Sequence, residues 1–374
     1  MKMTKRVLLL LSIVFLSSCE KFDEYNCGAN ANYEVTNLVT EEKAVEIINA
    51  VCNTLNSDQI IGAQVSIRDS LNEAWNISMG ATDLEQDNDL GNNHILRIGS
   101  VTKIYTATLI LKLVELDYLQ LDEKISKYYP DHENAKNITI ENLLNHSSGI
   151  VDVFALPSIF ISASNFPDKY WDPDNLVEVC LNKKLEFSPG SKHAYSNTNY
   201  IILGLIAEKV SGENIEKLFS DYLLKPLELN NTFLVPYMDT PSRLVNGYVH
   251  HFALSLKEWY TNEPENTAWS TIGFSAGAGA SNSSDLSAFT YHLFNGHIIS
   301  PESLALMTDF HGDKGLGLFK IKVNDRYYWG HEGEITGFES ITAYDPVEKI
   351  VISICYNTTP SNPHDLLNEI DKVL

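Results

Sequence analysis

The chain has few cations. Its 374 residues include 27 lysines and arginines against 49 aspartates and glutamates, which gives a formal net charge of −22 at pH 7. A surface of this sign repels nucleic-acid phosphates and anionic lipid headgroups. We therefore exclude a nucleic-acid-binding function.

Cysteines and metal-ligand spacings are also scarce. The chain has five cysteines and contains neither a C-x-x-C pair nor an H-E-x-x-H segment, so we expect no metal and no cofactor. Cys27 and Cys52 are the only pair for which a disulfide is considered. The preferred interpretation is that no bridge is needed and that Cys180 and Cys355 are small buried apolar residues.

Long apolar runs are absent after the N-terminus. The one candidate, Val7 to Leu16, follows three cations and precedes Leu16-Ser-Ser-Cys19. It is shorter than the roughly 20 residues of a membrane span, and it predicts a lipoprotein signal peptide over residues 1–18. We expect Cys19 to carry lipid and to anchor the protein in a bacterial cell envelope, at a periplasmic or surface face. The alternative is an ordinary leader that is cleaved elsewhere.

The remaining chain divides into a tether and one folded domain. Residues 19–40 are polar without a sustained period, and residues 41–374 form the domain. Helical periodicity begins after Thr40 and returns at residues 363–374. Alternating or apolar runs joined by short turns predict antiparallel strands, and helical segments broken by proline and glycine separate them. We predict an α/β part (41–119 and 300–374) with a helical insertion (120–299). The predicted strands are 60–68, 75–80, 315–323, 326–330, 338–344 and 349–356.

Ser100-Val-Thr-Lys103 is the first of three motifs that carry chemistry. It opens the segment from Ile104 to Leu116, which is apolar around most of its circumference and predicts a buried helix. Positions i and i+3 share a helix face, so Lys103 is predicted beside Ser100. A serine hydroxyl needs a neighbouring base to become a nucleophile. Lys103 is either that base or a charged neighbour that favours the phenolate of Tyr195. Taken alone, the motif fits a surface serine and lysine equally well.

Tyr195-Ser-Asn197 is the second motif. It follows Phe187-Ser-Pro-Gly190 and precedes a helical segment, which places it on a tight loop. On this loop Tyr195 would carry a proton to the leaving group, and Asn197 would hydrogen-bond the substrate and Lys103. Taken alone, the motif fits a turn with a helix cap.

His331-Glu-Gly333 is the third motif and ends an aromatic strand. Gly333 allows a substrate to approach the backbone closely. The amides of Ser100 and Glu334 are the predicted oxyanion hole, each worth about 3 kcal/mol in the transition state. We expect His331, Gly333 and Glu334 to contact the substrate. A lone histidine is more often structural, and His146 is interpreted in that way although it is close to the site.

The three motifs in this order resemble those of the serine β-lactamase and D-alanyl-D-alanine carboxypeptidase superfamily, in particular the branch of class C β-lactamases, penicillin-binding-protein-like carboxypeptidases and esterases. The resemblance covers about residues 45–360. It implies an α/β (α+β) fold in which an antiparallel five-stranded sheet is flanked by helices, with an inserted helical subdomain. The segments that carry it are Arg97-Ile-Gly-Ser-Val-Thr-Lys103, Leu143-Leu-Asn-His-Ser-Ser-Gly149, Phe187-Ser-Pro-Gly190 with Tyr195-Ser-Asn-Thr198, and Gly330-His-Glu-Gly333.

The resemblance also implies roles for single residues. Ser100 is the acylated nucleophile, and Lys103 and Tyr195 handle protons. Asn197 is a substrate contact. Which group takes the first proton is disputed across the superfamily and is left open.

The third motif departs from the β-lactamase pattern, which usually has Lys-Thr-Gly. His331 replaces the lysine, Glu332 removes the hydroxyl, and Glu334 adds an acid. Two acids beside the pocket disfavour an anionic substrate end, unless Glu332 points into solvent.

The sequence therefore predicts an envelope-anchored serine hydrolase that acts through an acyl-enzyme on Ser100. The expected substrate is a D-amino-acid peptide, ester or amide that is neutral or cationic. The alternatives are a true β-lactamase and a non-catalytic surface lipoprotein that binds a ligand with the same fold.

Overall fold

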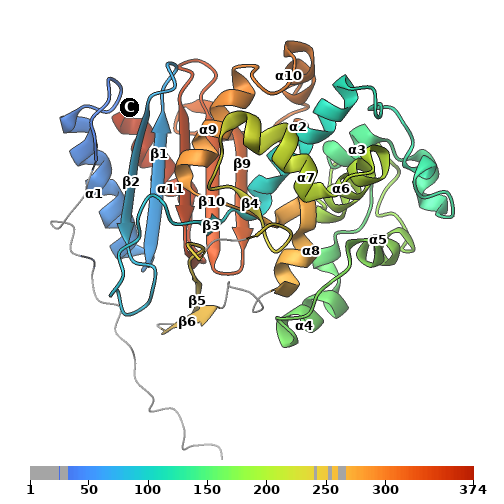
Figure 1. Ribbon diagram of the computed structural model, residues 1–374, viewed down its shortest axis with the longest axis horizontal. Helices are drawn as coiled ribbons and strands as arrows, with labels where there is room; N and C mark the ends of the chain where they lie inside the picture. Colours follow the sequence, from blue (N-terminus) through green and yellow to red (C-terminus); the bar gives the residue numbers. More distant parts are fainter. Residues whose placement is uncertain (1–24, 26–32, 240–241, 252–254, 260–266) are drawn as a thin grey trace, which may run out of the picture.

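A six-stranded antiparallel sheet forms the centre of the computed structural model, which describes Tyr25 and residues 33–239, 242–251, 255–259 and 267–374 (Figure 1). The six strand segments predicted from the periodicity agree with this sheet. The family resemblance implied a five-stranded sheet, which is one strand fewer. The sixth is the edge strand β8, which pairs with β9. In spatial order the strands are β2 (Ala74–Gly80), β1 (Gly62–Arg68), β11 (Val351–Tyr356), β10 (Phe338–Tyr344), β9 (Arg326–Ile335) and β8 (Phe319–Val323).

Helices cover both faces of this sheet (Figure 1). The helices α1 (Glu41–Ser57) and α11 (Pro363–Val373) pack on one face, and α9 (Ser283–Phe294) packs on the other. Because both faces are covered, every residue of β1 is buried. The polar residues of β1 face α9, where the hydroxyls of Ser66 and Ser287 lie 2.7 Å apart.

The helical part lies beside the sheet, at the right in Figure 1. Its central helix α2 (Thr102–Glu115) is buried around most of its circumference, as predicted, and packs on α6 and α8. The strands β4 to β7 and the sheet-packed helix α9 also fall within the predicted insertion 120–299, so that segment is not purely helical. The other helices are α3 (Ile140–Leu144), α4 (Pro157–Asn165), α5 (Pro173–Leu181), α6 (Asn197–Ser211), α7 (Ile215–Phe219), α8 (Thr267–Gly277) and α10 (Pro301–Met307).

Two small sheets join the helical part to the central sheet. One has the order β3, β7, β4, and the other has the order β12, β5, β6. Their strands are β3 (Leu96–Arg97), β7 (Gly279–Ser281), β4 (Phe233–Leu234), β12 (Thr358–Thr359), β5 (Gly247–His251) and β6 (Ser255–Trp259).

The strand β9 is longer than predicted. We expected it to end at Gly330, but its pairing with β10 continues to Ile335 opposite Phe338. The third motif therefore lies within a strand and not after one. Since side chains alternate along a strand, His331 and Glu332 point to opposite faces.

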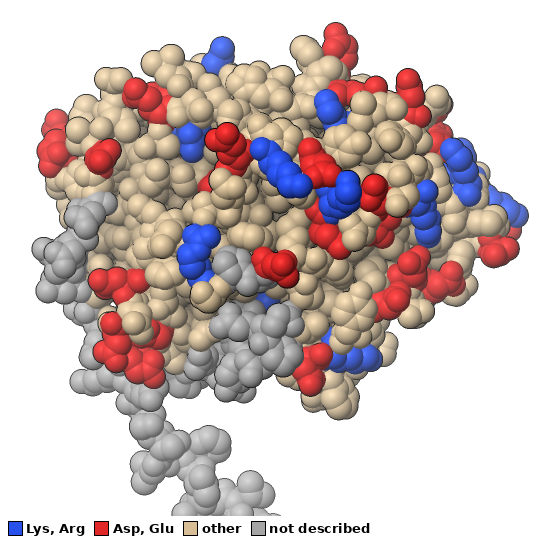
Figure 2. All heavy atoms as spheres, viewed as in Figure 1, with Lys and Arg blue, Asp and Glu red and all other residues tan. Residues whose placement is uncertain are grey.

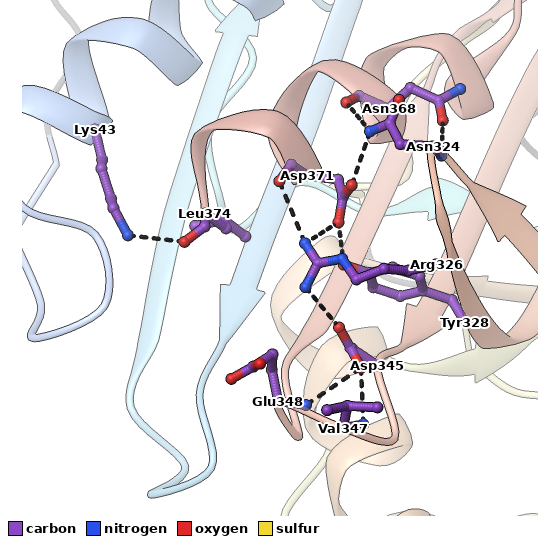
Figure 3. A network of polar contacts seen from close by, with 10 residues as sticks. All are labelled: Lys43, Asn324, Arg326, Tyr328, Asp345, Val347, Glu348, Asn368, Asp371 and Leu374. Atoms are coloured by element: carbon purple, nitrogen blue, oxygen red, sulfur yellow. Dashed lines mark hydrogen bonds and ion pairs between the residues drawn. The ribbon is translucent and has the colours of Figure 1, made fainter.

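A polar network holds α11 to the sheet (Figure 3). The buried carboxylate of Asp371 accepts hydrogen bonds from the guanidinium of Arg326 and from the Tyr328 hydroxyl, the latter at 2.6 Å. Arg326 also pairs with buried Asp345 at 2.9 Å. These contacts join α11, β9 and the β10–β11 turn.

The cysteines follow the prediction only in part. Cys180 and Cys355 are free and buried, as expected. Cys52, on the buried side of α1, is disulfide-bonded, so the preference for an unbridged chain is wrong. Its partner lies outside the described residues, as do the predicted signal peptide 1–18, Cys19 and Cys27. Sequence spacing alone does not reveal which thiols the fold brings within bonding distance. Within the described ranges, no helix is long and apolar enough to cross a membrane.

Candidate active site

Ser100 lies in a single 3-10 turn, Gly99–Val101, that runs directly into α2. Gly99 has a φ of +47°, and a Cβ atom there would lie 2.7 Å from the carbonyl oxygen of Glu334. Only glycine fits this left-handed position against a neighbouring strand. The turn is thereby held close to β9, and the backbone of Ser100 comes to lie near the backbone of Glu334.

Lys103 is one helical turn after Ser100 and is completely buried. Its Nζ is 2.9 Å from the Ser100 Oγ, 2.7 Å from the Asn197 Oδ1 and 2.7 Å from the carbonyl oxygen of Ala276. Burial lowers the pKa of Lys103 from 10.5 to about 7, and the negative charge of Asp152 opposes this shift. A neutral amine can donate to Asn197 and Ala276 and still direct its lone pair at the Ser100 hydroxyl.

Tyr195 reaches Ser100 from the loop before α6. Its hydroxyl donates to the Ser100 Oγ at 2.8 Å, and the Lys103 Nζ lies 4.8 Å from its ring centroid. Desolvation raises the pKa of the phenol above its ordinary value, so Tyr195 is protonated at neutral pH and acts as a hydrogen-bond donor. Ser100 therefore has an amine on one side and a protonated phenol on the other.

Asn197 is held by a residue that the sequence analysis missed. Its backbone N–H donates to the Oδ1 of Asp152 at 3.0 Å, and its side-chain amide lies 3.2 Å from both carboxylate oxygens. These bonds direct the amide oxygen of Asn197 at Lys103. Asp152 comes three residues after the segment from Leu143 to Gly149. Its closeness in sequence to that family-type segment could have indicated that it belongs to the site.

The residues of the third motif lie around a cavity of about 550 Å³ that also reaches Ser100 and Tyr195. His331 is buried, and its Nδ1 lies within hydrogen-bond distance of the carbonyl oxygen of Glu332. Burial, with the nearby charge of Lys103, lowers the pKa of His331 to about 3, so its ring is neutral. Gly333 is required because a Cβ would lie 2.0 Å from the carbonyl oxygen of Ile98.

Three carboxylates line the same cavity. Glu332, Glu334 and Glu339 share one face of the sheet, and Glu334 lies directly opposite Glu339 across β9 and β10. Like charges in this register destabilise a sheet. The pKa of Glu339 is raised to about 7, chiefly by burial and also by its two acidic neighbours. The sequence analysis missed Glu339 because only the strand register places it here.

A second cavity, of about 510 Å³, also reaches Ser100 and shares Glu334 with the first cavity. Its wall includes Phe154, Phe160 and Trp269, whose rings pack together, with centroids 6.2 Å apart for Phe154 and Trp269. Gly273 and Gly277 of α8 also line it. Ser100 therefore borders both a carboxylate-lined cavity and an aromatic one.

A family model described as Beta-lactamase matches residues 40–372 of this chain. The chain belongs to the beta-lactamase family. An Escherichia coli K12 protein named "Putative D-alanyl-D-alanine carboxypeptidase" is 25% identical, with 96% of this chain and 92% of that protein covered. The family resemblance drawn from the three motifs is thus confirmed, and the chain is a serine hydrolase of the beta-lactamase family.

Solved structures share the fold. A D-stereospecific amidohydrolase from Streptomyces sp. is 25% identical with a TM-score of 0.76, covering 87% of this chain and 97% of that one. A D-amino acid amidase from Ochrobactrum anthropi SV3, complexed with L-phenylalanine, is 23% identical with a TM-score of 0.79, covering 89% of this chain and 98% of that one. The predicted mixed fold, with an antiparallel sheet flanked by helices, is confirmed.

The structure of this beta-lactamase family member brings together every motif residue that the sequence singled out within the described ranges. Ser100, Lys103, Tyr195 and Asn197 form one chain of hydrogen bonds. The other three contribute to the walls around it: His331, Gly333 and Glu334. The sequence did not indicate Asp152, the Ala276 carbonyl, Glu339 or the aromatic residues of the second cavity.

Proposed function

We propose that this protein hydrolyses the amide, peptide or ester bond of a D-amino-acid derivative through an acyl-enzyme on Ser100. The observation that carries the proposal is the contact chain from Lys103 through Ser100 to Tyr195, in which Ser100 borders both cavities. Such a chain couples removal of the serine proton to protonation of a leaving group.

The opposite pKa shifts of Lys103 and Tyr195 divide the two proton-transfer roles. Neutral Lys103 takes the proton of the Ser100 hydroxyl, and the Ser100 Oγ attacks the substrate carbonyl carbon. The backbone amides of Ser100 and Glu334 face the developing oxyanion. Tyr195 then gives its proton to the departing nitrogen or oxygen, and Lys103 supplies its replacement. Water hydrolyses the acyl-enzyme by the same transfers in reverse.

The aromatic cavity indicates the acyl side chain. Phe154 and Trp269 form an apolar wall that runs up to Ser100 and Asn197, and Phe160 lies half-exposed at this wall. A wall of this kind favours an aromatic or branched aliphatic side chain. The names of the D-stereospecific amidohydrolase and the D-amino acid amidase support a D-configured acyl group.

The carboxylate-lined cavity indicates the charge of the substrate. Glu332, Glu334 and Glu339 disfavour a carboxylate there and favour an ammonium group. Lys320 and Lys322 also reach this cavity, but they alternate with Ile321 and lie on the other face of the sheet. This distribution of charge favours neutral or cationic amides and esters over penicillins.

Acylation tests the proposal directly. A form that begins at residue 21 is mixed briefly with the p-nitrophenyl ester of an N-protected D-phenylalanine, and its intact mass is measured. We expect a single acyl adduct in the wild-type protein and none in Ser100→Ala, while Ser191→Ala, at an exposed position of the loop before Tyr195, still forms it. An adduct that persists in Ser100→Ala overturns the assignment.

We also propose that Cys19 carries lipid and anchors the enzyme to the bacterial envelope. The basis is the sequence pattern of residues 1 to 19. Residues 19–40 would then connect the lipid anchor to the folded domain. In a bacterial host, Cys19→Ala should move the protein from the membrane pellet to the soluble fraction. Recovery of that variant entirely in the pellet contradicts the anchor.

A further inference from the structure

His146 binds both chain neighbours of Tyr195. Its carbonyl oxygen accepts the Ala194 N–H at 3.0 Å, and its Nδ1 accepts the Ser196 N–H at 3.2 Å. The imidazole also packs against the phenol ring, with centroids 4.5 Å apart and planes inclined by 32°. One residue therefore holds Tyr195 through the backbone on both sides and through the ring.

Tyr195 needs such support because it is 37% exposed. An error of about 1 Å in the position of a reacting group can cost about a hundredfold in rate. His146, in contrast, is only 3% exposed. Its ring is fixed by the Asn199 side chain, 3.3 Å from Nδ1, and by the Tyr200 ring at 5.1 Å.

The hydrogen bonds determine the tautomer of the ring. Because Nδ1 accepts the Ser196 N–H, the proton of the neutral ring is on Nε2. Among the described residues Nε2 has no hydrogen-bond partner, although it is buried. An apolar ring in the same place would avoid that unpaired N–H, so the acceptor at Nδ1 is the feature that requires histidine.

The surroundings keep this acceptor unprotonated. Burial is the largest cause that lowers the pKa of His146, and the positive charge of Lys103 acts in the same direction. The Ser196 N–H that donates to Nδ1 occupies the lone pair that protonation of this nitrogen would need. The ring therefore remains an acceptor throughout the neutral range.

We propose that His146 is a positioning residue that holds the Tyr195 hydroxyl in line between Ser100 and the leaving group. It does not touch the reacting atoms and acts only through Tyr195. This inference rests on the proposed acyl transfer at Ser100. It goes beyond the family motifs by giving a catalytic consequence to a histidine that the sequence analysis treated as structural.

The test compares an amide with the p-nitrophenyl ester of the same acyl group, chosen from acyl groups that the wild-type protein turns over. Nitrophenolate leaves without a proton, whereas an amine must be protonated as it departs. His146→Gly removes the ring at a residue whose φ of +58° glycine tolerates well. His146→Asn keeps an acceptor near the Nδ1 position and also tolerates that φ. His193→Asn, on the neighbouring imidazole 5.7 Å away, is the matched control.

We expect His146→Gly to lower kcat/KM, which reports acylation, about 100-fold for the amide, while kcat/KM for the ester changes by less than about threefold. His146→Asn should recover part of the amide activity, and His193→Asn should retain both activities. Equal loss on amide and ester overturns the inference, as does an unchanged amide rate or a failure of Asn to improve on Gly. The proposed function is judged separately, because it fails only if the wild-type ester turnover survives in Ser100→Ala.

Discussion

At the scale of single residues, the site depends on one buried amine. Lys103 has lost its hydration and keeps three fixed polar contacts, so its charged and neutral forms are close in free energy near neutral pH. A lysine in this state is a usable base, whereas an exposed lysine is almost wholly protonated at pH 7.

The pH dependence of catalysis should show the ionisation of Lys103. Below its pKa of about 7 the ammonium form has no lone pair for the Ser100 proton, and above that value the neutral form predominates. We therefore expect kcat/KM to rise tenfold per pH unit below about pH 7 and then to level off. A profile from pH 5 to 9 that is flat across this range contradicts the role of Lys103 as base.

Asp152 should move that profile. Its negative charge raises the pKa of Lys103 against the effect of burial, so Asp152→Asn should shift the ionisation to lower pH. The asparagine keeps an oxygen for the Asn197 N–H. Asp117→Asn, at an exposed residue just after α2, should leave the profile in place. A shift to higher pH in Asp152→Asn is the contradictory result.

At the scale of elements, the position of α11 relative to the sheet depends on a few buried charges (Figure 3). Asp371 and Asp345 are buried, while the guanidinium of Arg326 that joins them is partly exposed. An amphipathic helix can slide on an apolar sheet, but directional bonds from Arg326 and Tyr328 specify one position.

Asp371→Ala should lower the free energy of unfolding by about 2 kcal/mol, because it leaves the Tyr328 hydroxyl and Arg326 without their acceptor. Urea unfolding followed by circular dichroism measures this loss. Glu369→Ala is the control on the same helix, since its pair with Lys372 is exposed and contributes about 0.5 kcal/mol or less. Equal destabilisation by the two variants would show that the network has no special weight.

At the scale of the whole molecule, negative charge extends from the surface into the site. Acidic groups are spread over the face drawn in Figure 2, with cations interspersed among them. With a net charge of −22 and three carboxylates in one cavity, the enzyme should attract cationic substrates and repel anionic ones.

We expect kcat/KM to be higher for a substrate with a cationic leaving group than for its counterpart with an anionic one. The ratio of these two kcat/KM values should fall as salt screens the charges. Glu339→Gln should reduce the ratio. Because the pKa of Glu339 is about 7, its negative charge is lost as the pH falls below that value. The preference for the cationic substrate should therefore weaken as the pH is lowered. Rates measured from 0.02 to 0.5 M salt test this, and a ratio that is independent of salt contradicts it.

The sequence by itself determined the chemistry of the nucleophile. The i to i+3 spacing of Ser100 and Lys103 on an apolar helix is a local property, and local periodicity also located all six strands of the central sheet. The motif order was enough to indicate the family, because each motif supplies a group that acyl transfer requires.

Only the tertiary structure decided how those groups are supported and what surrounds them. Asp152 at Asn197 and His146 beside Tyr195 are contacts between segments far apart in the chain, and Glu339 meets Glu334 through the register of the β9–β10 hairpin. The bonded state of Cys52 was likewise decided by the fold. Such contacts depend on strand register and helix packing, which no local pattern encodes, because each results from the burial of many side chains at once.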